Sequence, residues 1–194
     1  MVRAVFLDRD GVINRKVREG HYVTRWREVK LMPGVGRAVK WMREAGFLIV
    51  VVSNQRAIAK GLISEVGLEF LHLRMWQKLF RGRRGFDAVY YCPHDNVIPC
   101  ACRKPQPGML LAASRDCGIN LAASWMVGDS EVDVQAGQRA GCQTIRIGPS
   151  RIRALTVADE VTRSLPEAAK LILAKEQLAA PAIHPKSNNP VLTL

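Results

Sequence analysis

Residues 4–10, AVFLDRD, run from four apolar side chains directly into two carboxylates. A short, unbroken apolar run is typical of a strand that is buried on both faces of a parallel sheet, and the polar residues mark where the strand ends. Ligands of open α/β sheets bind beyond the carboxyl ends of such strands. The sequence therefore places Asp8 and Asp10 at the edge of the sheet where a ligand is expected.

The alternation of strand and helix continues along the chain. Further strands are predicted at 48–52, 88–91, 124–127 and 143–147, and helices near 35–45, 64–81, 108–117, 131–140 and 165–179. Strands that alternate with helices predict a parallel sheet covered on both faces. We therefore expect an α/β fold, a Rossmann-like three-layer sandwich with a central parallel sheet.

Length and composition favour one globular domain. The chain has 194 residues, of which 48% are apolar, and we assign 1–179 to a single domain. Residues 180–194 carry three prolines and no helical period, so we expect a flexible tail. No stretch approaches the ~20 uncharged apolar residues of a membrane span. We expect a cytoplasmic monomer without a membrane partner.

The chain is strongly basic, with a net charge of +12 from 29 Lys and Arg against 17 Asp and Glu. Such a charge is compatible with nucleic acid or with small phosphorylated ligands. The basic residues are scattered, and no aromatic side chains interleave with them as a base-stacking surface would require. We favour a basic solvated surface, and a nucleic-acid-binding module remains the alternative from another functional class.

Polar residues follow four of the predicted strands. Asp8 and Asp10 end the first, Ser53 and Asn54 the second, and Asp129 the fourth, while the loop after the third carries Lys104. Carboxylates at positions 8, 10 and 129 can hold a hard cation such as Mg²⁺, and one of them can attack phosphorus. Lys104 and the Ser53 hydroxyl suit the phosphoryl oxygens. These strand ends together predict a phosphoryl-transfer site.

Four segments resemble the motifs of the haloacid dehalogenase superfamily of phosphotransferases. They are LDRDGVIN at 7–14, VVVSNQ at 50–55, RKPQPG at 103–108 and VGDSEVD at 127–133. The resemblance implies that Asp8 is the nucleophile and a Mg²⁺ ligand, and that Asp10 is the general acid and base and binds Mg²⁺ through its backbone carbonyl. It further implies that Ser53 and Lys104 hold phosphate and that Asp129 completes the metal site. Asp133 is expected to support its loop.

The spacing leaves no room for a cap domain. About 40 residues separate Asn14 from Asn54, and the core needs them for a helix and a strand. The stretch from Gln55 to Tyr90 holds one long helix and little more. We therefore expect a capless member of the superfamily.

The segment CPHDNVIPCAC at 92–102 brings three thiols and one imidazole together, at Cys92, His94, Cys100 and Cys102. Four such ligands fit a closed tetrahedral Zn²⁺ site, which leaves no open position for water. We expect a structural Zn²⁺ that braces the loop beside Arg103 and Lys104. The alternative is a set of incidental or reactive thiols.

This loop resembles a zinc-loop subgroup whose members hydrolyse D-glycero-D-manno-heptose 1,7-bisphosphate or histidinol phosphate. The segments NQRAIAKG, YYCPH and RKPQPGM look more like the heptose enzymes, which remove the C7 phosphate during nucleotide-heptose and lipopolysaccharide precursor synthesis. Asn54 and Arg103 fall where those enzymes contact substrate, and the planar Arg103 guanidinium suits a second phosphate. We expect a phosphorylated sugar as substrate. Histidinol phosphate or a broad range of small phosphate esters remains open.

Three positions depart from the subgroup pattern. Arg56 and Ala57 replace a small Ser-Gly pair, and Ser130 stands where some heptose enzymes have lysine. Arg56 could face either the substrate or solvent. His21 and Tyr22 could touch substrate or lie on the surface, whereas His72, among apolar neighbours, is expected to be packed.

Overall fold

The structure is a computed structural model that describes residues 2–18, 20–82 and 85–179. The tail predicted at 180–194 lies outside the described residues, and the domain boundary at residue 179 stays a prediction. Among the described residues, no helix combines the length and the apolar character needed to cross a membrane.

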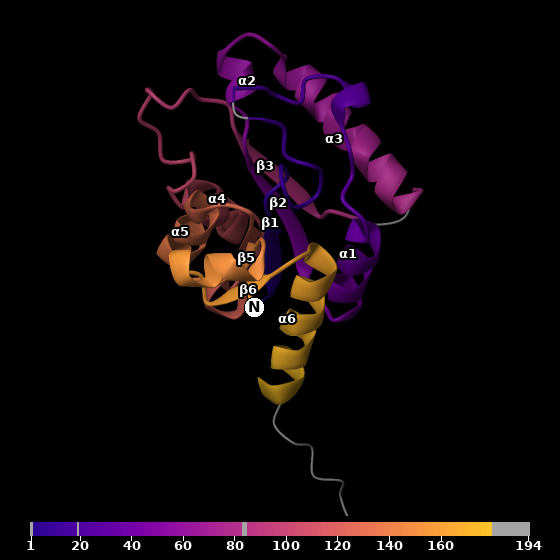
Figure 1. Ribbon diagram of the computed structural model, residues 1–194, viewed down its shortest axis with the longest axis vertical. Helices are drawn as coiled ribbons and strands as arrows, with labels where there is room; N and C mark the ends of the chain where they lie inside the picture. Colours follow the sequence, from indigo (N-terminus) through magenta and orange to yellow (C-terminus); the bar gives the residue numbers. More distant parts are fainter. Residues whose placement is uncertain (1, 19, 83–84, 180–194) are drawn as a thin grey trace, which may run out of the picture.

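One parallel sheet of six strands forms the centre of the molecule, in the order β3-β2-β1-β4-β5-β6 (Figure 1). The strands are β1 (Ala4–Leu7), β2 (Leu48–Asn54), β3 (Ala88–Cys92), β4 (Trp125–Gly128), β5 (Gln143–Ile147) and β6 (Glu160–Thr162). The chain builds outward from β1 to β3 and then resumes on the other side of β1 with β4. Neighbouring strands whose connections leave in opposite directions open a crevice between them. The crevice lies beyond the carboxyl ends of β1 and β4.

Helices cover both faces of the sheet (Figure 1). They are α1 (Val35–Glu44), α2 (Arg56–Ala59), α3 (Glu65–Phe80), α4 (Gly108–Cys117), α5 (Glu131–Ala140) and α6 (Leu165–Ala179). Alternate residues of β1 enter different cores, since Val5 and Leu7 pack with α1, α3 and α6, whereas Phe6 packs with α4 and α5. The period of two along a strand thus produces two apolar layers, one on each face. The predicted three-layer α/β sandwich is confirmed.

All five predicted strands and all five predicted helices are present, but some bounds and elements differ. The second strand was predicted to end at residue 52, yet β2 extends to Asn54 because Ser53 and Asn54 pair with β3. The edge strand β6 and the single-turn α2 were not predicted. Strand β6 is three residues long and only partly buried, so it has no apolar run to reveal it.

The segments around the crevice contain no inserted domain among the described residues. Between β1 and α1 they form only the 3-10 turn η1 (Trp26–Glu28), and between β2 and β3 they form α2 and α3. Two further 3-10 turns, η2 (Leu121–Ala123) and η3 (Ser150–Leu155), lie in the second half. The expectation of a capless chain agrees with this arrangement.

Candidate active site

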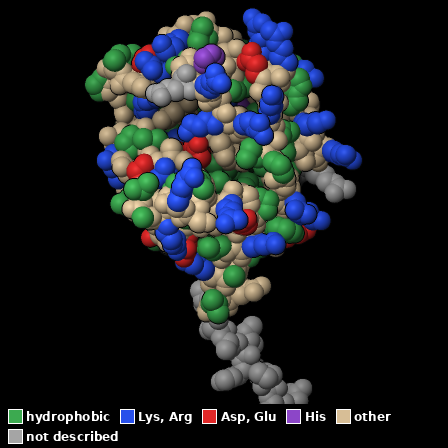
Figure 2. All heavy atoms as spheres, in the orientation of Figure 1, with side chains coloured by type: hydrophobic (Ala, Val, Ile, Leu, Met, Phe, Trp, Pro, Cys, Tyr) green, Lys and Arg blue, Asp and Glu red, His purple; other side chains and the backbone are tan. Residues whose placement is uncertain are grey.

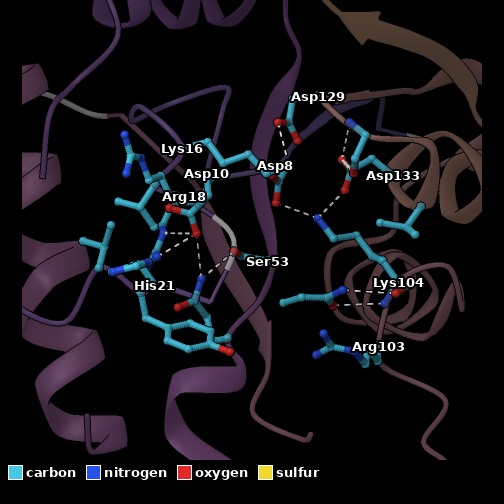
Figure 3. Close-up of a pocket in the computed structure, with 18 residues that line it drawn as sticks. Asp8, Asp10, Lys16, Arg18, His21, Ser53, Arg103, Lys104, Asp129 and Asp133 are labelled. Atoms are coloured by element: carbon cyan, nitrogen blue, oxygen red, sulfur yellow. Dashed lines mark hydrogen bonds and ion pairs between the residues drawn. The ribbon is translucent and has the colours of Figure 1, made fainter. Parts of the chain in front are cut away.

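A cavity of about 480 Å³ opens at the carboxyl ends of β1, β2 and β4. Figure 3 shows its lining side chains converging from these strand ends and from the loop after β3. The cavity contains every residue that the sequence assigned to catalysis, phosphate binding or Mg²⁺: Asp8, Asp10, Ser53, Asn54, Arg103, Lys104 and Asp129. Its size is within the range of small-molecule sites.

Lys104 lies between two buried carboxylates. Its Nζ is 2.6 Å from Asp8 Oδ1 and 2.6 Å from Asp133 Oδ1, and it donates to Val52 O at 2.8 Å (Figure 3). Lys104 and Asp133 are only 3% and 1% exposed. Burial raises the pKa of Asp8 to about 7 although Lys104 opposes the shift. Burial would lower the pKa of Lys104, but the carboxylates of Asp133 and Asp8 outweigh it and raise that pKa above its ordinary value.

A third carboxylate completes the cluster. Ligand oxygens of Asp8, Asp129 and Asp133 all lie within 4.8 Å of one another, within the span that one bridging cation requires. Gly11, with φ +100°, makes room for this cluster, since a Cβ on Gly11 would lie 2.4 Å from Asp129 Oδ2. Carboxylate oxygens are the ligands that hard divalent cations prefer. The donor set thus fits Mg²⁺.

Asp133 belongs to the support of this cluster. It occupies the first turn of α5, where its side chain accepts hydrogen bonds from the backbone N–H and the hydroxyl of Ser130. Together with the Ser130 side chain this forms a capping box. Ser130, one of the departures noted in the sequence, thus holds Asp133 in place.

Asp10 faces a different set of partners. Its Oδ2 accepts from Arg9 Nη2 at 2.7 Å and from Gln55 Nε2 at 3.3 Å, and its Oδ1 accepts from Asn14 Nδ2 at 2.8 Å. Burial raises the pKa of Asp10, but Arg9 and the hydrogen bond from Asn14 outweigh it, so the pKa is lowered overall. Two neighbouring carboxyl groups on one loop therefore have pKa values shifted in opposite directions. In the free protein these directions are the reverse of what an ionised nucleophile and a proton donor need, so the two roles depend on the charges that a bound cation and a phosphate bring.

Ser53 and Asn54 both line the cavity, but they differ in whether their polar atoms are already hydrogen-bonded. The Ser53 hydroxyl accepts from Gln55 Nε2 at 2.8 Å, which leaves its own proton available to an incoming acceptor. Asn54 Nδ2 donates to Lys104 O at 3.1 Å, and Asn54 Oδ1 accepts from Lys104 N at 3.0 Å. The Asn54 amide thus positions the backbone of the lysine, and direct contact of Asn54 with a substrate stays a prediction.

The four residues predicted to bind zinc come together in one group. Cys92 Sγ lies 3.5 Å from His94 Nδ1 and 3.7 Å from Cys100 Sγ, and Cys102 Sγ lies 3.3 Å from His94 Nδ1 and 3.6 Å from Cys100 Sγ. Ligands placed 2.0–2.3 Å from a central ion in a tetrahedron stand roughly 3.3–3.8 Å apart. All five cysteines are free thiols. The donor types and their separations fit a tetrahedral Zn²⁺.

The Cys/His loop is tied to the cavity. Arg103 Nη1 donates to His94 O at 3.1 Å, so the guanidinium that lines the cavity is held by the loop. Arg56 pairs with Asp95 at 2.7 Å and does not line the cavity. This arginine therefore links α2 to the loop. The sequence had predicted that it faces either the substrate or solvent, and this pairing with Asp95 was not expected.

Lys16 and Arg18 of the site were missed from the sequence, whereas His21 and Tyr22 were expected either to touch substrate or to lie on the surface. Lys16 and Arg18 line the cavity together with His21 and Tyr22, all from the segment between β1 and α1. Lys16 Nζ lies 2.8 Å from Asp129 Oδ2. Two cations shortly after the first motif were the available signal, but only the path of the loop brings them back over the cavity. Figure 2 shows Lys and Arg side chains spread over the visible face with Asp and Glu among them.

Comparison with known proteins gives a consistent result. The family model of the haloacid dehalogenase-like hydrolases matches residues 2–141. A Yersinia pestis protein named D-glycero-beta-D-manno-heptose-1,7-bisphosphate 7-phosphatase is 40% identical over 90% of this chain and 97% of its own length. A Mycobacterium tuberculosis protein named as the corresponding alpha-anomer phosphatase is 38% identical over 74% of this chain and 78% of its own.

A solved structure has a similar fold. It is the crystal structure of D,D-heptose 1,7-bisphosphate phosphatase from B. bronchiseptica complexed with magnesium and phosphate. The TM-score is 0.81 at 31% sequence identity, with 90% of this chain and 99% of the other covered.

Proposed function

This chain belongs to the haloacid dehalogenase-like hydrolase family, and from that premise we propose that it is a Mg²⁺-dependent phosphatase with Asp8 as its nucleophile. The main support is the buried cluster in which Asp8 meets Lys104 and lies within 4.8 Å of the ligand oxygens of Asp129 and Asp133. A carboxylate beside a fixed ammonium and further carboxylates can attack phosphorus while cations hold the phosphoryl oxygens.

The reaction proceeds in two displacements. Asp8 attacks the phosphorus atom, the bond to the sugar oxygen breaks, and Asp10 donates its proton to that oxygen. Asp10 then takes a proton from a water molecule, which attacks the aspartyl phosphate, releases phosphate and regenerates Asp8. Although Asp10 has a lowered pKa in the free protein, the arriving phosphate dianion raises it by like-charge repulsion and favours the protonated form.

The Mg²⁺ site would use the carboxylates of Asp8 and Asp129 and the backbone carbonyl of Asp10. When bound, the cation would supply positive charge that reduces the repulsion between the Asp8 carboxylate and the phosphate of the substrate. Lys104 and Ser53 hold the phosphoryl oxygens, and Asp133 keeps Lys104 in place.

The proposed substrate is D-glycero-D-manno-heptose 1,7-bisphosphate, from which the enzyme removes the C7 phosphate. The named relatives cover most of the chain, and the cavity carries Lys16, Arg18 and Arg103 besides Lys104. A substrate with two phosphates needs cations beyond those at the reacting group. We propose that Arg18 and Arg103 meet the second phosphate, whereas Lys16, whose Nζ is 2.8 Å from Asp129 Oδ2, lies beside the reacting group.

A substrate panel tests this proposal. We expect kcat/KM with Mg²⁺ to be at least about 100-fold higher for one heptose 1,7-bisphosphate anomer than for histidinol phosphate or simple sugar monophosphates. Both anomers must be included, because the relatives are named for different ones. A preference for histidinol phosphate would overturn the proposed substrate assignment. Salt-dependent nucleic-acid binding without any phosphatase activity would overturn the reaction class.

We further propose that Cys92, His94, Cys100 and Cys102 hold a structural Zn²⁺. Removal of this ion by a zinc-selective chelator, with Mg²⁺ resupplied, is expected to raise KM about fivefold or more and to change kcat less. The reason is that His94 O anchors Arg103, whereas Asp8 and Asp10 are held by other elements. Metal analysis should find one zinc per chain. Activity that requires zinc alone, without Mg²⁺, would contradict this division of roles.

Binding of Mg²⁺ should depend on pH through Asp8. Its pKa of about 7 in the metal-free protein means that below pH 7 a proton must leave before the carboxylate binds a cation. We expect the affinity for Mg²⁺ to fall about tenfold per pH unit below 7 and to level off above it. Calorimetric titrations at pH 6 and pH 8, each in two buffers of different ionisation enthalpy, measure both affinity and proton release. Equal affinity at the two pH values would contradict the expectation.

A further inference from the structure

Arg9 is buried beside Asp10, between the active-site cavity and a second, much smaller cavity, and it lines both. The residue is 2% exposed, and its Nε and Nη2 both donate to Asp10 Oδ2, at 3.2 and 2.7 Å. Its remaining terminal nitrogen, Nη1, is buried and has no hydrogen-bond partner among the described residues. A guanidinium N–H can only donate. Arg9 therefore lacks one acceptor on the side opposite Asp10.

A matching acceptor comes from α3. His72 Nε2 is also buried without a hydrogen-bond partner in the described part of the chain. Arg9 and His72 line the same small cavity of about 10 Å³, whose other walls are apolar: Ile13, Val51, Met75, Phe86 and Val89. This volume is at the size of one water molecule. Two unpaired polar atoms that face one cavity among apolar side chains indicate a single shared hydrogen-bonded link.

The protonation state of His72 is compatible with an acceptor. Burial, and after it the charge of Arg9, lower the pKa of His72 to about 4. The imidazole is therefore neutral at physiological pH, and with the proton on Nδ1 its Nε2 accepts. The ring also contacts Tyr91, with centroids 6.4 Å apart.

We propose that one buried water molecule accepts a hydrogen bond from Arg9 Nη1 and donates one to His72 Nε2, and that His72 is thereby a positioning residue for Asp10. This inference rests on the proposed phosphatase function, in which Asp10 transfers the proton. Anchored on both sides, the Arg9 guanidinium cannot turn about its own axis. The Asp10 carboxylate that it holds thus keeps a fixed orientation for the proton transfer.

Two substrates with different leaving groups test the proposal. An alkyl phosphate, such as the sugar substrate, leaves as an alkoxide that needs the proton of Asp10, whereas p-nitrophenyl phosphate leaves as a stabilised phenolate that does not. Because kcat/KM reports the steps up to formation of the aspartyl phosphate, it isolates this proton transfer. For His72→Leu we expect kcat/KM to fall about tenfold with the alkyl phosphate and less than about threefold with p-nitrophenyl phosphate.

Two further variants separate positioning from packing. His72→Gln places an amide near the position of Nε2, so it can still accept from the water and should retain most of the alkyl-phosphate activity. Met75→Leu alters an apolar wall of the same cavity. Any loss of kcat/KM in this variant should be the same for both substrates. Equal losses on both substrates in His72→Leu, or a His72→Gln variant no better than His72→Leu, would overturn the proposal.

Nitrogen-15 NMR of the wild-type imidazole gives a result that does not depend on turnover. We expect His72 as the neutral tautomer protonated on Nδ1, and a tautomer protonated on Nε2 would overturn the link to Arg9. Wild-type protein that hydrolyses neither substrate would instead refute the phosphatase function, while the tautomer would still decide whether Nε2 accepts.

Discussion

Asp8→Asn is expected to lower kcat by a factor on the order of 10⁴ or more while the protein remains folded. An amide is a poor nucleophile and a weaker ligand for a hard cation, so both proposed roles of Asp8 are lost. The fold should tolerate the change because Asn has the same shape and carries no charge into a buried position. Lys104 keeps its contacts with Asp133 and Val52 O.

Phosphate release at saturating substrate and Mg²⁺ measures this effect, and thermal unfolding followed by circular dichroism measures the fold. Asp116→Asn is the matched control, because Asp116 is an exposed carboxylate whose side chain accepts from the Tyr90 hydroxyl outside the cavity. The control should keep its activity. More than about a tenth of wild-type turnover in Asp8→Asn, after its mass has been verified, would remove Asp8 from the mechanism.

The course of the main chain was largely predictable because its strands are buried on both faces. Val5 and Phe6 are both inaccessible although they point into different layers, and this is why β1 appears in the sequence as an unbroken apolar run. The carboxyl ends of parallel strands share one edge, so the residues that follow them had to converge there. This constraint predicts that Asp8 and Asp129 share one edge of the sheet, and the two carboxylates meet because β1 and β4 are neighbours, which the sequence did not predict.

What the sequence did not predict depends on contacts between elements remote in the chain. Lys16 reaches Asp129 only because the segment after β1 folds back over the cavity. Arg56 turns to Asp95 because α2 lies beside the Cys/His loop. The side chains are long and have many rotamers, so residue type alone does not fix their direction. The edge strand β6 exists through its pairing with β5, which leaves no periodic pattern in three residues.

The Arg9 side chain shows the same limit at the centre of the site. An arginine between two aspartates would be expected to face solvent or substrate, yet Arg9 is 2% exposed and bonded to Asp10. A strand residue alternates in direction with its neighbours. Arg9, two residues beyond Leu7, thus lies on the same side of the sheet as Val5 and Leu7, and its burial is sustained by the ion pair with Asp10.

Removal of the Lys104 charge should have the largest effect on stability. Lys104→Met keeps the length of the side chain but leaves Asp8 and Asp133 buried without their ammonium partner, and Val52 O without its donor. We expect the free energy of unfolding of the metal-free protein to fall by about 3–5 kcal/mol at pH 7.5. Chemical denaturation measures it. Lys40→Met is the control. Lys40 is exposed on α1 and forms a surface ion pair with Glu44 at 3.7 Å, and such a pair contributes about 0.5 kcal/mol or less to stability.

The pH dependence of this loss identifies its cause. Without Lys104, whose charge lowers the pKa of Asp8, the folded-state pKa of Asp8 rises further above its unfolded value. A carboxyl group with a raised folded pKa stabilises the fold while it is protonated, and this stabilisation is lost as the pH rises through the folded pKa. Below pH 7 Asp8 is protonated in both folded proteins, so the deficit of Lys104→Met relative to wild type should be smaller at pH 7 than at pH 9. A deficit of the same size at both pH values would point to lost packing of the lysine stem, and the electrostatic account of the Asp8, Lys104 and Asp133 cluster would then be wrong.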